Sequence, residues 1–339
     1  MAQSIGEHVT TAPSHPQSTT PKPTSSKLKS ARGTGKQGNK IFSGVSTGAA
    51  LMILGTLAAV AAFLIYRAWP ALTDSELRIR TVGSADTVSL AAFTGPQIFG
   101  TLLSAFLAML IAVPVSVGIA LFISHYAPRR VAATLGYLVD LLAAIPSVLY
   151  GLWGGVWLLP RLLPVYEWLS DYLGFIPLFR GPVSASGKVM ASVAIILAVM
   201  ILPIITAVAR EVFLQTPKLH EEAALALGAT RWEMIKMAVL PFGRSGIVSA
   251  SMLGLGRALG ETMAVVMVLG IGSTYSWEIL KAGQHSTIAA NIALQFPESN
   301  AEIASALIAT GLALFVITMV VNMAARAIIA RRAEFSGAN

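Results

Sequence analysis

Long apolar stretches without a single charge constrain this chain more than any other feature of its sequence. Ile41 to Tyr66 contains no Asp, Glu, Lys or Arg, and five further apolar segments follow at residues 98–123, 131–159, 189–209, 247–271 and 303–325. Lipid offers the backbone no hydrogen bonds, so runs of about 20 apolar residues indicate membrane-spanning helices. Together with a mean hydropathy of +0.71, this predicts an all-α integral membrane protein with six transmembrane helices and excludes a soluble globular enzyme.

The ends of the chain differ in composition from the spans. Residues 1–40 are rich in Pro, Ser, Thr and Gly, and they carry six basic residues against one acid. Such a segment buries too little apolar surface to offset its ordering entropy, so we predict a disordered basic tail. We expect residues 41–330 to form one six-helix membrane domain that includes the loop 210–246, and residues 331–339 to form a short C-terminal tail.

The distribution of Lys and Arg predicts the orientation in the membrane. Sixteen of the 24 basic residues lie in the amino tail, in the loops 124–130 and 210–246, and after residue 325, whereas seven lie on the alternate side. Cytoplasmic loops collect Lys and Arg, so both termini are expected in the cytoplasm of a multi-pass protein of the cytoplasmic membrane. The net charge of +8 is thereby explained by the basic loops of a protein in a lipid bilayer, and no nucleic-acid partner is expected.

The cytoplasmic loop 210–246 is predicted to contain two short helices. Thr216 can cap a helix whose first residue is Pro217, because proline suits the first helical position. This helix should run over residues 218–227 and end at Gly228, a residue type common just after helices.

A second helix is predicted to begin at Thr230, which has capping-box spacing to Glu233, and to end at Pro241. Across the two helices, six residues keep the spacing of the EAA…G…LP signature of ABC importer permeases: Glu222, Ala223, Ala224, Gly228, Leu240 and Pro241. Ala238 stands where that signature usually has Ile. The alternative interpretation is an ordinary amphipathic helix at the membrane surface.

Two charges fall inside the fifth predicted span. Arg257 would lie about 15 Å into the helix, near the middle of the bilayer, where a charge requires a cavity or a partner. Glu261 is four residues further and could pair with it on one helix face. Gly256 and Gly260 have the small-xxx-small spacing that permits close packing of another backbone.

The functional interpretation of this pair is an anion site, because a guanidinium matches the oxygens of phosphate or sulfate with a bidentate fork. The alternative is a structural ion pair within the membrane, with Asp140 of the third span as a third member.

Three segments, one of which contains Arg257 and Glu261, resemble the same protein family. The stretches Gly-Arg-Ala-Leu-Gly-Glu-Thr-Met-Ala-Val at 256–265, Ala-Ile-Pro-Ser-Val-Leu-Tyr-Gly-Leu-Trp-Gly at 144–154 and Ile-Leu-Pro-Ile-Ile-Thr at 201–206 are similar to the phosphate-specific ABC importer permeases of the PstC type. The resemblance covers roughly residues 45–330. It implies a MetI-like permease fold in which Arg257 and Glu261 occupy the positions of the charged pair needed for phosphate transport, and Asp140 stands where relatives carry an acid.

The resemblance also implies the partners. They are inorganic phosphate, a sister permease PstA in a heterodimer, two copies of the ATPase PstB, and the phosphate-binding protein PstS. The EAA helix would dock into a groove of the ATPase, which would hold ATP and Mg, and this chain would bind no cofactor of its own.

The remaining sequence offers little sign of catalysis. The segment 181–188 spaces its glycines one residue too far apart for a phosphate-binding loop, there is no cysteine, and the five histidines lie outside the predicted spans. We therefore expect a permease subunit and not an enzyme. Alternatives are a permease for sulfate, molybdate or phosphonate, a secondary transporter or channel that needs no ATPase, and a membrane scaffold or sensor.

Overall fold

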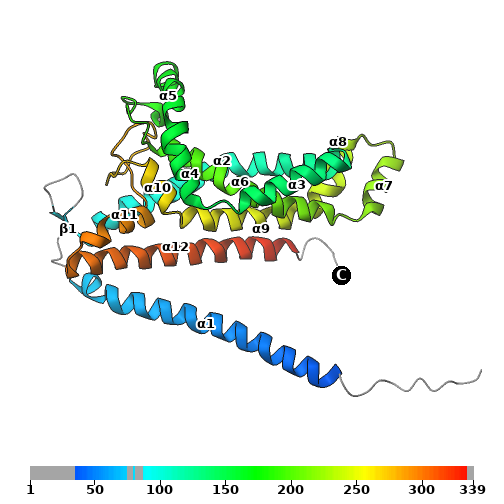
Figure 1. The fold of residues 1–339 in the computed structure, drawn as a ribbon, viewed down its shortest axis with the longest axis horizontal. Coiled ribbons are helices and arrows are strands. Elements are labelled where there is room, and N and C mark those ends of the chain that lie inside the picture. Colours follow the sequence, from blue (N-terminus) through cyan, green and yellow to red (C-terminus); the bar gives the residue numbers. More distant parts are fainter. Residues whose placement is uncertain (1–34, 75–78, 81–86, 334–339) are drawn as a thin grey trace, which may run out of the picture. The chain divides into compact units, whose positions relative to one another are not determined.

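The computed structural model describes residues 35–74, 79–80 and 87–333 (Figure 1). The chain divides into two units, Met1–Leu57 and Ala58–Asn339. Most of the predicted disordered tail lies outside the described residues, but residues 35–40 are helical, so the tail does not extend to residue 40 as expected. The predicted C-terminal tail also begins inside a helix, since the last helix ends at Ala333.

The described residues are almost entirely helical. The first half of the chain contains α1 (Gly35–Thr73), α2 (Leu90–Leu121) with a π-turn at Phe122–Tyr126, α3 (Arg129–Ala143), α4 (Ser147–Trp153) with a π-turn at Gly154–Leu158, and α5 (Leu159–Leu173). Two short antiparallel strands, β1 (Ile79–Arg80) and β2 (Thr87–Val88), lie between α1 and α2.

The second half begins with a 3₁₀ turn at Pro177–Phe179 and continues with α6 (Met190–Leu214), α7 (Lys218–Ala226), α8 (Arg231–Met234), a π-turn at Ile235–Val239 and α9 (Leu240–Leu259). Then follow α10 (Met263–Val268), α11 (Ile288–Gln295), a 3₁₀ turn at Phe296–Glu298 and α12 (Ala301–Ala333).

Six described helices are long and apolar enough to cross a membrane, in agreement with the predicted number: Gly38–Thr73, Leu90–Tyr126, Ser147–Leu173, Met190–Leu214, Arg231–Leu259 and Ala301–Ala327. The third and fifth differ from the predicted segments 131–159 and 247–271. The third is interrupted because Pro146 disfavours a helical conformation at the preceding residue, and α3 ends at Ala143.

The fifth span begins earlier than predicted and also ends earlier. The second loop helix was expected to stop at Pro241, but α8, the π-turn and α9 continue through it. The wider hydrogen-bond spacing of the π-turn accommodates a residue without an N–H. The helix then ends at Leu259, twelve residues before the predicted end at residue 271.

Helix α6 forms the centre of the second unit. It contacts α2, α3 and α9, and 67% of its most apolar window is buried, the largest share among the six candidate spans. Small residues let the neighbouring helices approach it: Ala105, Ala108 and Ala112 of α2 are buried in the same core as Ile201 and Ile205 of α6. In Figure 1, α2, α3, α6 and α9 run side by side, while α5 leaves this group at a steep angle.

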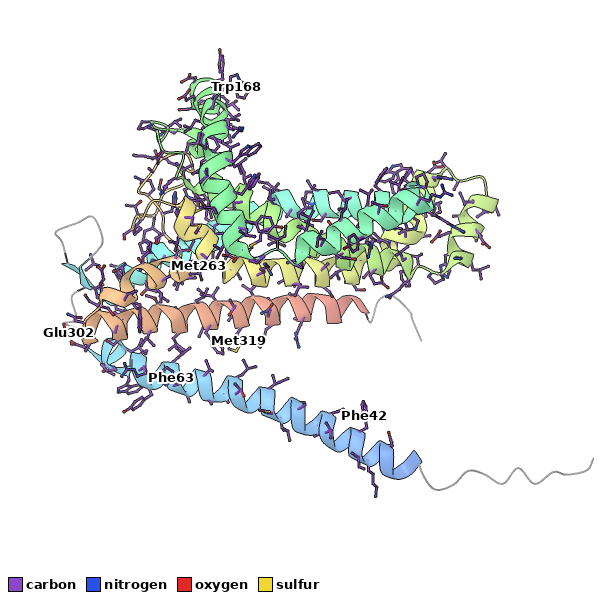
Figure 2. All side chains as sticks on the ribbon, in the orientation of Figure 1. Phe42, Phe63, Trp168, Met263, Glu302 and Met319 are labelled. Carbon is purple, nitrogen blue, oxygen red and sulfur yellow. The ribbon has the colours of Figure 1, made fainter. Side chains whose placement is uncertain are left out.

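Large apolar side chains are exposed along the outer helices of the isolated chain. Phe63 of α1 is 58% exposed and Met319 of α12 is 48% exposed (Figure 2). A soluble protein would not leave so many of these side chains in water, whereas lipid or a neighbouring membrane subunit would cover them. Trp168 of α5 also points away from the helix group (Figure 2).

Candidate functional site

Arg257 lies in the last turn of α9. Because α9 ends at Leu259, Arg257 lies close to the carboxyl end of the helix dipole, where a positive charge is favoured. Arg257 makes no ion pair with any carboxylate of the described residues, and its buried Nε has no hydrogen-bond partner. The guanidinium therefore has no carboxylate partner in the described part of the chain.

A cleft of about 700 Å³ opens beside this side chain, between α6, α9 and α12. Its lining consists of Ile204, Ser249, Met252, Leu253, Gly256, Arg257, Asn322, Ala325 and Arg326. The lining contains two guanidinium groups, one amide and one hydroxyl, and it contains no carboxylate. Among the predicted pathway residues, only Arg257 reaches this cleft.

Glu261 does not form the predicted ion pair with Arg257. The expectation of a shared helix face fails because α9 ends between the two residues. Glu261 is instead buried in the break before α10, and its Oε1 accepts a hydrogen bond from the backbone N–H of Ala264 at 3.0 Å. The carboxylate thus caps the first turn of α10, which begins at Met263 (Figure 2).

Asp140 likewise forms no ion pair with Arg257. Its Oδ2 is 3.5 Å from Nη2 of Arg210, so that it joins α3 to α6. The predicted three-member network of Arg257, Glu261 and Asp140 is therefore not formed. Tyr150, in contrast, is close enough to Arg257 to interact electrostatically, and its hydroxyl donates to the carbonyl of Leu142 at 2.9 Å.

Neither Gly256 nor Gly260 packs closely against another helix in the described part of the chain; a Cβ on Gly260 would meet only the backbone oxygen of Gly256, at 3.7 Å. A Cβ on Gly256 would meet no atom within 4 Å, and Gly256 lines the open cleft instead. The small-residue face that contacts α6 includes Gly254, whose added Cβ would lie 2.7 Å from Cδ1 of Ile205. The close approach of α9 to α6 thus depends on Gly254 and not on Gly256.

The predicted corner between α7 and α8 is confirmed. Gly228 follows α7 with φ +86°, a left-handed conformation that glycine adopts without strain. Thr230 and Glu233 form the predicted capping box: the Thr230 hydroxyl accepts from the backbone N–H of Glu233, and the Glu233 carboxylate accepts from the backbone N–H of Thr230. The start of α7 differs: Pro217 is itself the cap residue with an extended backbone, so Thr216 is one residue too distant to cap the helix.

One face of this corner is anchored to the membrane helices and the other is exposed. Ala224 is buried in a cluster with Phe213 of α6 and Ile235 of the π-turn before α9. Glu221 Oε1 lies 3.5 Å from Nε2 of His125 in the π-turn that follows α2. On the other face, the exposed residues include Glu222, Ala223 and three large apolar side chains, Leu219, Leu227 and Trp232. Leu227 is 90% exposed.

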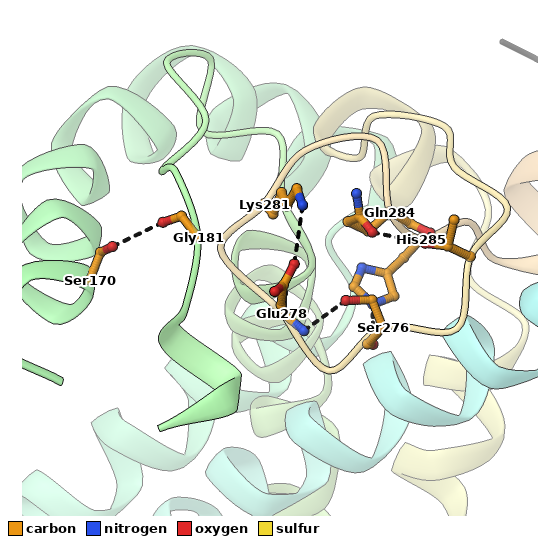
Figure 3. Close-up of polar contacts among 8 residues, drawn as sticks. Ser170, Gly181, Ser276, Glu278, Lys281, Gln284 and His285 are labelled. Carbon is orange, nitrogen blue, oxygen red and sulfur yellow. Dashed lines mark hydrogen bonds and ion pairs between the residues drawn. The ribbon is translucent and has the colours of Figure 1, made fainter. Parts of the chain in front are cut away.

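A compact set of loops lies at the opposite end of α9, formed by residues 174–188 and 269–287 (Figure 3). Glu278 pairs with Lys281 at 3.3 Å, and Ser170 Oγ donates to the carbonyl of Gly181 at 3.0 Å. His285 is buried, and its Nε2 donates to the carbonyl of Ser276 at 2.7 Å. Burial lowers the pKa of His285 below 6.5, against the opposing effects of the Ser276 hydrogen bond and the Glu278 charge.

Three polar residues that line the cleft or pair with Asp140 have no sequence signal of their own. Arg326 counts in the sequence only as a marker of orientation, Asn322 lies in an apolar run, and Arg210 lies at the end of a span. Their importance depends on which helices pack together, which a single sequence does not contain. Within the described part of the chain, no group of three His, Asp or Glu side chains could hold a metal ion.

Comparison with known proteins gives the family. The family described as binding-protein-dependent transport system inner membrane component matches residues 87–334. Proteins named phosphate transport system permease protein PstC 2, from Mycobacterium tuberculosis and Mycobacterium bovis, are each 45% identical over 86% of this chain and 92% of their own length. The PstC protein of Mycobacterium leprae is 46% identical over 79% of this chain and 86% of its own.

Among solved structures, a chain of a bacterial ABC transporter for the acidic polysaccharide alginate aligns with a TM-score of 0.49 at 18% identity, over 86% of this chain and 99% of that chain. The family match covers more than half of the chain. The alignments with the two PstC 2 proteins cover 92% of the length of those relatives. The chain is a multi-pass membrane protein that belongs to the family of binding-protein-dependent transport system inner membrane components, the permease subunits of ABC importers.

Proposed function

We propose that this chain is the permease subunit of an ATP-driven importer that moves inorganic phosphate across the cytoplasmic membrane, with both of its termini in the cytoplasm. The observation that carries the proposal is the Arg257 guanidinium, which faces a cleft and has no carboxylate partner among the described residues. The names of the mycobacterial relatives support phosphate as the anion.

The chemistry of Arg257 suits a transported oxyanion. A guanidinium presents planar donors that match two oxygens of a phosphate group, and it stays charged at every physiological pH. It replaces part of the hydration that the anion loses on entering the cleft. Transport requires that the anion leaves again, so the contact with Arg257 should be weak, and we assign tight selection of phosphate to a separate binding protein, PstS.

The energy source is assigned to other subunits. The chain would pair with the sister permease PstA, and two copies of the ATPase PstB, holding ATP and Mg, would grip the α7–α8 corner of each permease. The exposed Glu222 and Ala223, with the neighbouring apolar side chains, offer a surface for that contact. Ala224, Gly228, Leu240 and Pro241 would keep the corner attached to α9, so that movement of the ATPases reaches Arg257 through one continuous helix from Arg231 to Leu259.

Two alternative functions would use Arg257 and the α7–α8 corner differently. A permease for sulfate, molybdate or phosphonate would use the same guanidinium, because arginine does not distinguish these anions. A secondary transporter would need no ATPase, and the exposed α7–α8 corner would then have no partner.

The direct test is uptake of radiolabelled phosphate into vesicles that carry the complete complex, with and without ATP, and with sulfate as competitor. We expect ATP-dependent uptake that excess sulfate does not inhibit. Arg257→Gln should abolish this uptake while the complex still assembles, and Arg130→Gln, an exposed arginine at the start of α3, should transport as the wild type does. Sulfate competition would favour the other oxyanion permeases, and uptake without ATP would favour a secondary transporter.

The ATPase contact has its own test. Glu222→Lys should weaken co-purification of the ATPase with the permease, because it reverses an exposed charge in the proposed contact. Glu298→Lys reverses an exposed charge in the turn after α11 and should leave co-purification unchanged. Equal co-purification of both variants with the wild type would exclude Glu222 from the contact.

A further inference from the structure

The cleft beside Arg257 contains a second cation from another helix. Arg326 and Asn322, both of α12, line the same cleft of about 700 Å³. On the basis of the proposed function, we propose that Arg326, assisted by Asn322, is a second phosphate-contacting residue, which receives the anion from Arg257 on its way along α12.

The direction of the two helices brings their side chains toward one another. Helix α12 contacts α9 and runs antiparallel to it (Figure 1). Long side chains on a helix lean toward its N-terminus. Arg257 in the last turn of α9 therefore leans back over Leu253, and Arg326 in the last third of α12 leans back over Asn322. In antiparallel neighbours these two directions converge, and both guanidiniums line one cleft.

The charges in the cleft favour an anion between these groups. Neither Arg257 nor Arg326 makes an ion pair with a carboxylate in the part of the chain that the structure describes. Two like charges that face one partly apolar cleft repel each other through a medium that screens less than water does. A tetrahedral oxyanion removes this repulsion because its oxygens can accept hydrogen bonds from both guanidiniums, and the amide of Asn322 adds a neutral donor.

The exposure of the two arginines gives the path a direction. Arg257 is half-buried, whereas Arg326 and Asn322 are exposed in the isolated chain. An anion that moves from Arg257 to Arg326 therefore leaves a half-buried cation for a more exposed one and keeps a cationic partner throughout. Arg326 lies near the end of α12, which the basic residues that follow it in the sequence assign to the cytoplasmic side, so this step would release phosphate inward.

The test uses the complete complex in vesicles and compares Arg326→Gln, Arg326→Lys and Asn322→Ala with the control Arg130→Gln. Loss of one charge-assisted contact should lower the maximal phosphate uptake rate of Arg326→Gln about tenfold. The phosphate concentration that gives half-maximal uptake should not change, because the binding protein sets it. Arg326→Lys should remain within about threefold of the wild type, since an ammonium group still binds phosphate as a point charge although it loses the planar fork.

Several outcomes separate this inference from the proposed function. A wild-type complex that moves phosphate, together with an Arg326→Gln complex that moves it equally fast, would overturn the role of Arg326 and leave the function intact. An equal loss in Arg130→Gln would overturn it too, since the effect would then belong to positive charge in general. If Arg326→Gln does not assemble, Asn322→Ala decides: a severalfold lower uptake rate supports the second contact, and an unchanged rate overturns it.

Discussion

Arg210 and Asp140 form an ion pair across two helices, with 3.5 Å between Nη2 of the first and Oδ2 of the second. Gly136, one turn before Asp140 in α3, makes room for it: a Cβ there would lie 1.8 Å from Nη1 of Arg210. The pair fixes α3 against α6, which contacts both α2 and α9. Asp140 thus has a structural partner of its own, away from Arg257.

We predict that Asp140→Asn affects stability and not transport. The Asp140 side chain is 54% exposed, so the pair should contribute less than about 1 kcal/mol to the free energy of unfolding. Thermal unfolding of the four members of a double-mutant cycle with Arg210→Gln measures this coupling. Uptake per assembled complex should equal that of the wild type. A variant complex that is fully stable but takes up no phosphate would indicate that Asp140 takes part in transport.

We predict that the side-chain oxygen of Glu261, and not an ion pair, supports the segment after α9. Glu261→Ala removes the acceptor for the N–H of Ala264 and should cost about 1 kcal/mol, the usual effect of losing a helix cap. Glu261→Gln keeps an acceptor oxygen and should cost less. Thermal unfolding of the two variants in detergent measures the difference. A Gln variant as unstable as the Ala variant would indicate that the negative charge itself is required there.

The sequence was sufficient for features that depend on local pattern. Six apolar runs predicted six spans, and the Thr230–Glu233 spacing predicted a capping box because that motif is complete within four residues. The sequence was insufficient where the exact end of a helix determines whether two side chains share one face. The predicted pairing of Arg257 with Glu261 assumed an unbroken helix, but α9 ends at Leu259 with Gly260 as its C-cap. That glycine did not stand out as a stop signal, because Gly254 and Gly256 lie within the same helix. The partner of Glu261 is a backbone N–H exposed by that break.

Long-range contacts were also beyond the sequence. Arg326 reaches the cleft of Arg257 only because α12 packs on α9, and Asp140 meets Arg210 only because α3 packs on α6. These residues are about 70 positions apart in each pair, and a single sequence records no such proximity. The distribution of basic residues identified Arg326 as one of many charges near the cytoplasm, and only the packing gives it a specific neighbour.

We predict that Gly228→Ala destabilises the α7–α8 corner. A Cβ at this position would meet no atom within 4 Å, so space is not limiting, but φ is +86°. An alanine in this left-handed conformation costs about 1–2 kcal/mol. Gly228→Asn should cost less, since asparagine tolerates the conformation. Hydrogen exchange of the α7 amides measures the effect, and equal protection in the Ala variant and the wild type would contradict it.

We predict that two glycines of the same helix respond differently to alanine. A Cβ on Gly100 of α2 would lie 2.1 Å from the backbone oxygen of Ser286, which has to move, whereas a Cβ on Gly118 would meet nothing within 4 Å. Gly100→Ala should therefore cost about 1–3 kcal/mol through overpacking. Gly118→Ala should be neutral or slightly stabilising, because alanine favours the helix. Thermal unfolding compares the two, and equal melting temperatures would show that the loop around Ser286 yields freely.

We predict that acidification loosens the loop 269–287 through His285. Burial beside Phe99 lowers the pKa of His285 below 6.5, even though the Ser276 hydrogen bond and the Glu278 charge oppose the shift. The open loop therefore binds a proton at a higher pH than the closed loop does, so its stability is complete above about pH 6.5 and decreases as the pH falls toward the lowered pKa.

Hydrogen-exchange protection of residues 274–287 measures this effect between pH 7.5 and pH 5, with intrinsic exchange rates taken into account. His285→Gln keeps a donor for the carbonyl of Ser276 but does not titrate, so its protection should not depend on pH in this range. His220→Gln, which changes an exposed histidine of α7, should behave as the wild type does. Because the Glu278 charge favours the protonated histidine, Glu278→Gln should enlarge the pH dependence. Protection that does not change with pH in the wild type would mean that the loop stays closed around a protonated His285.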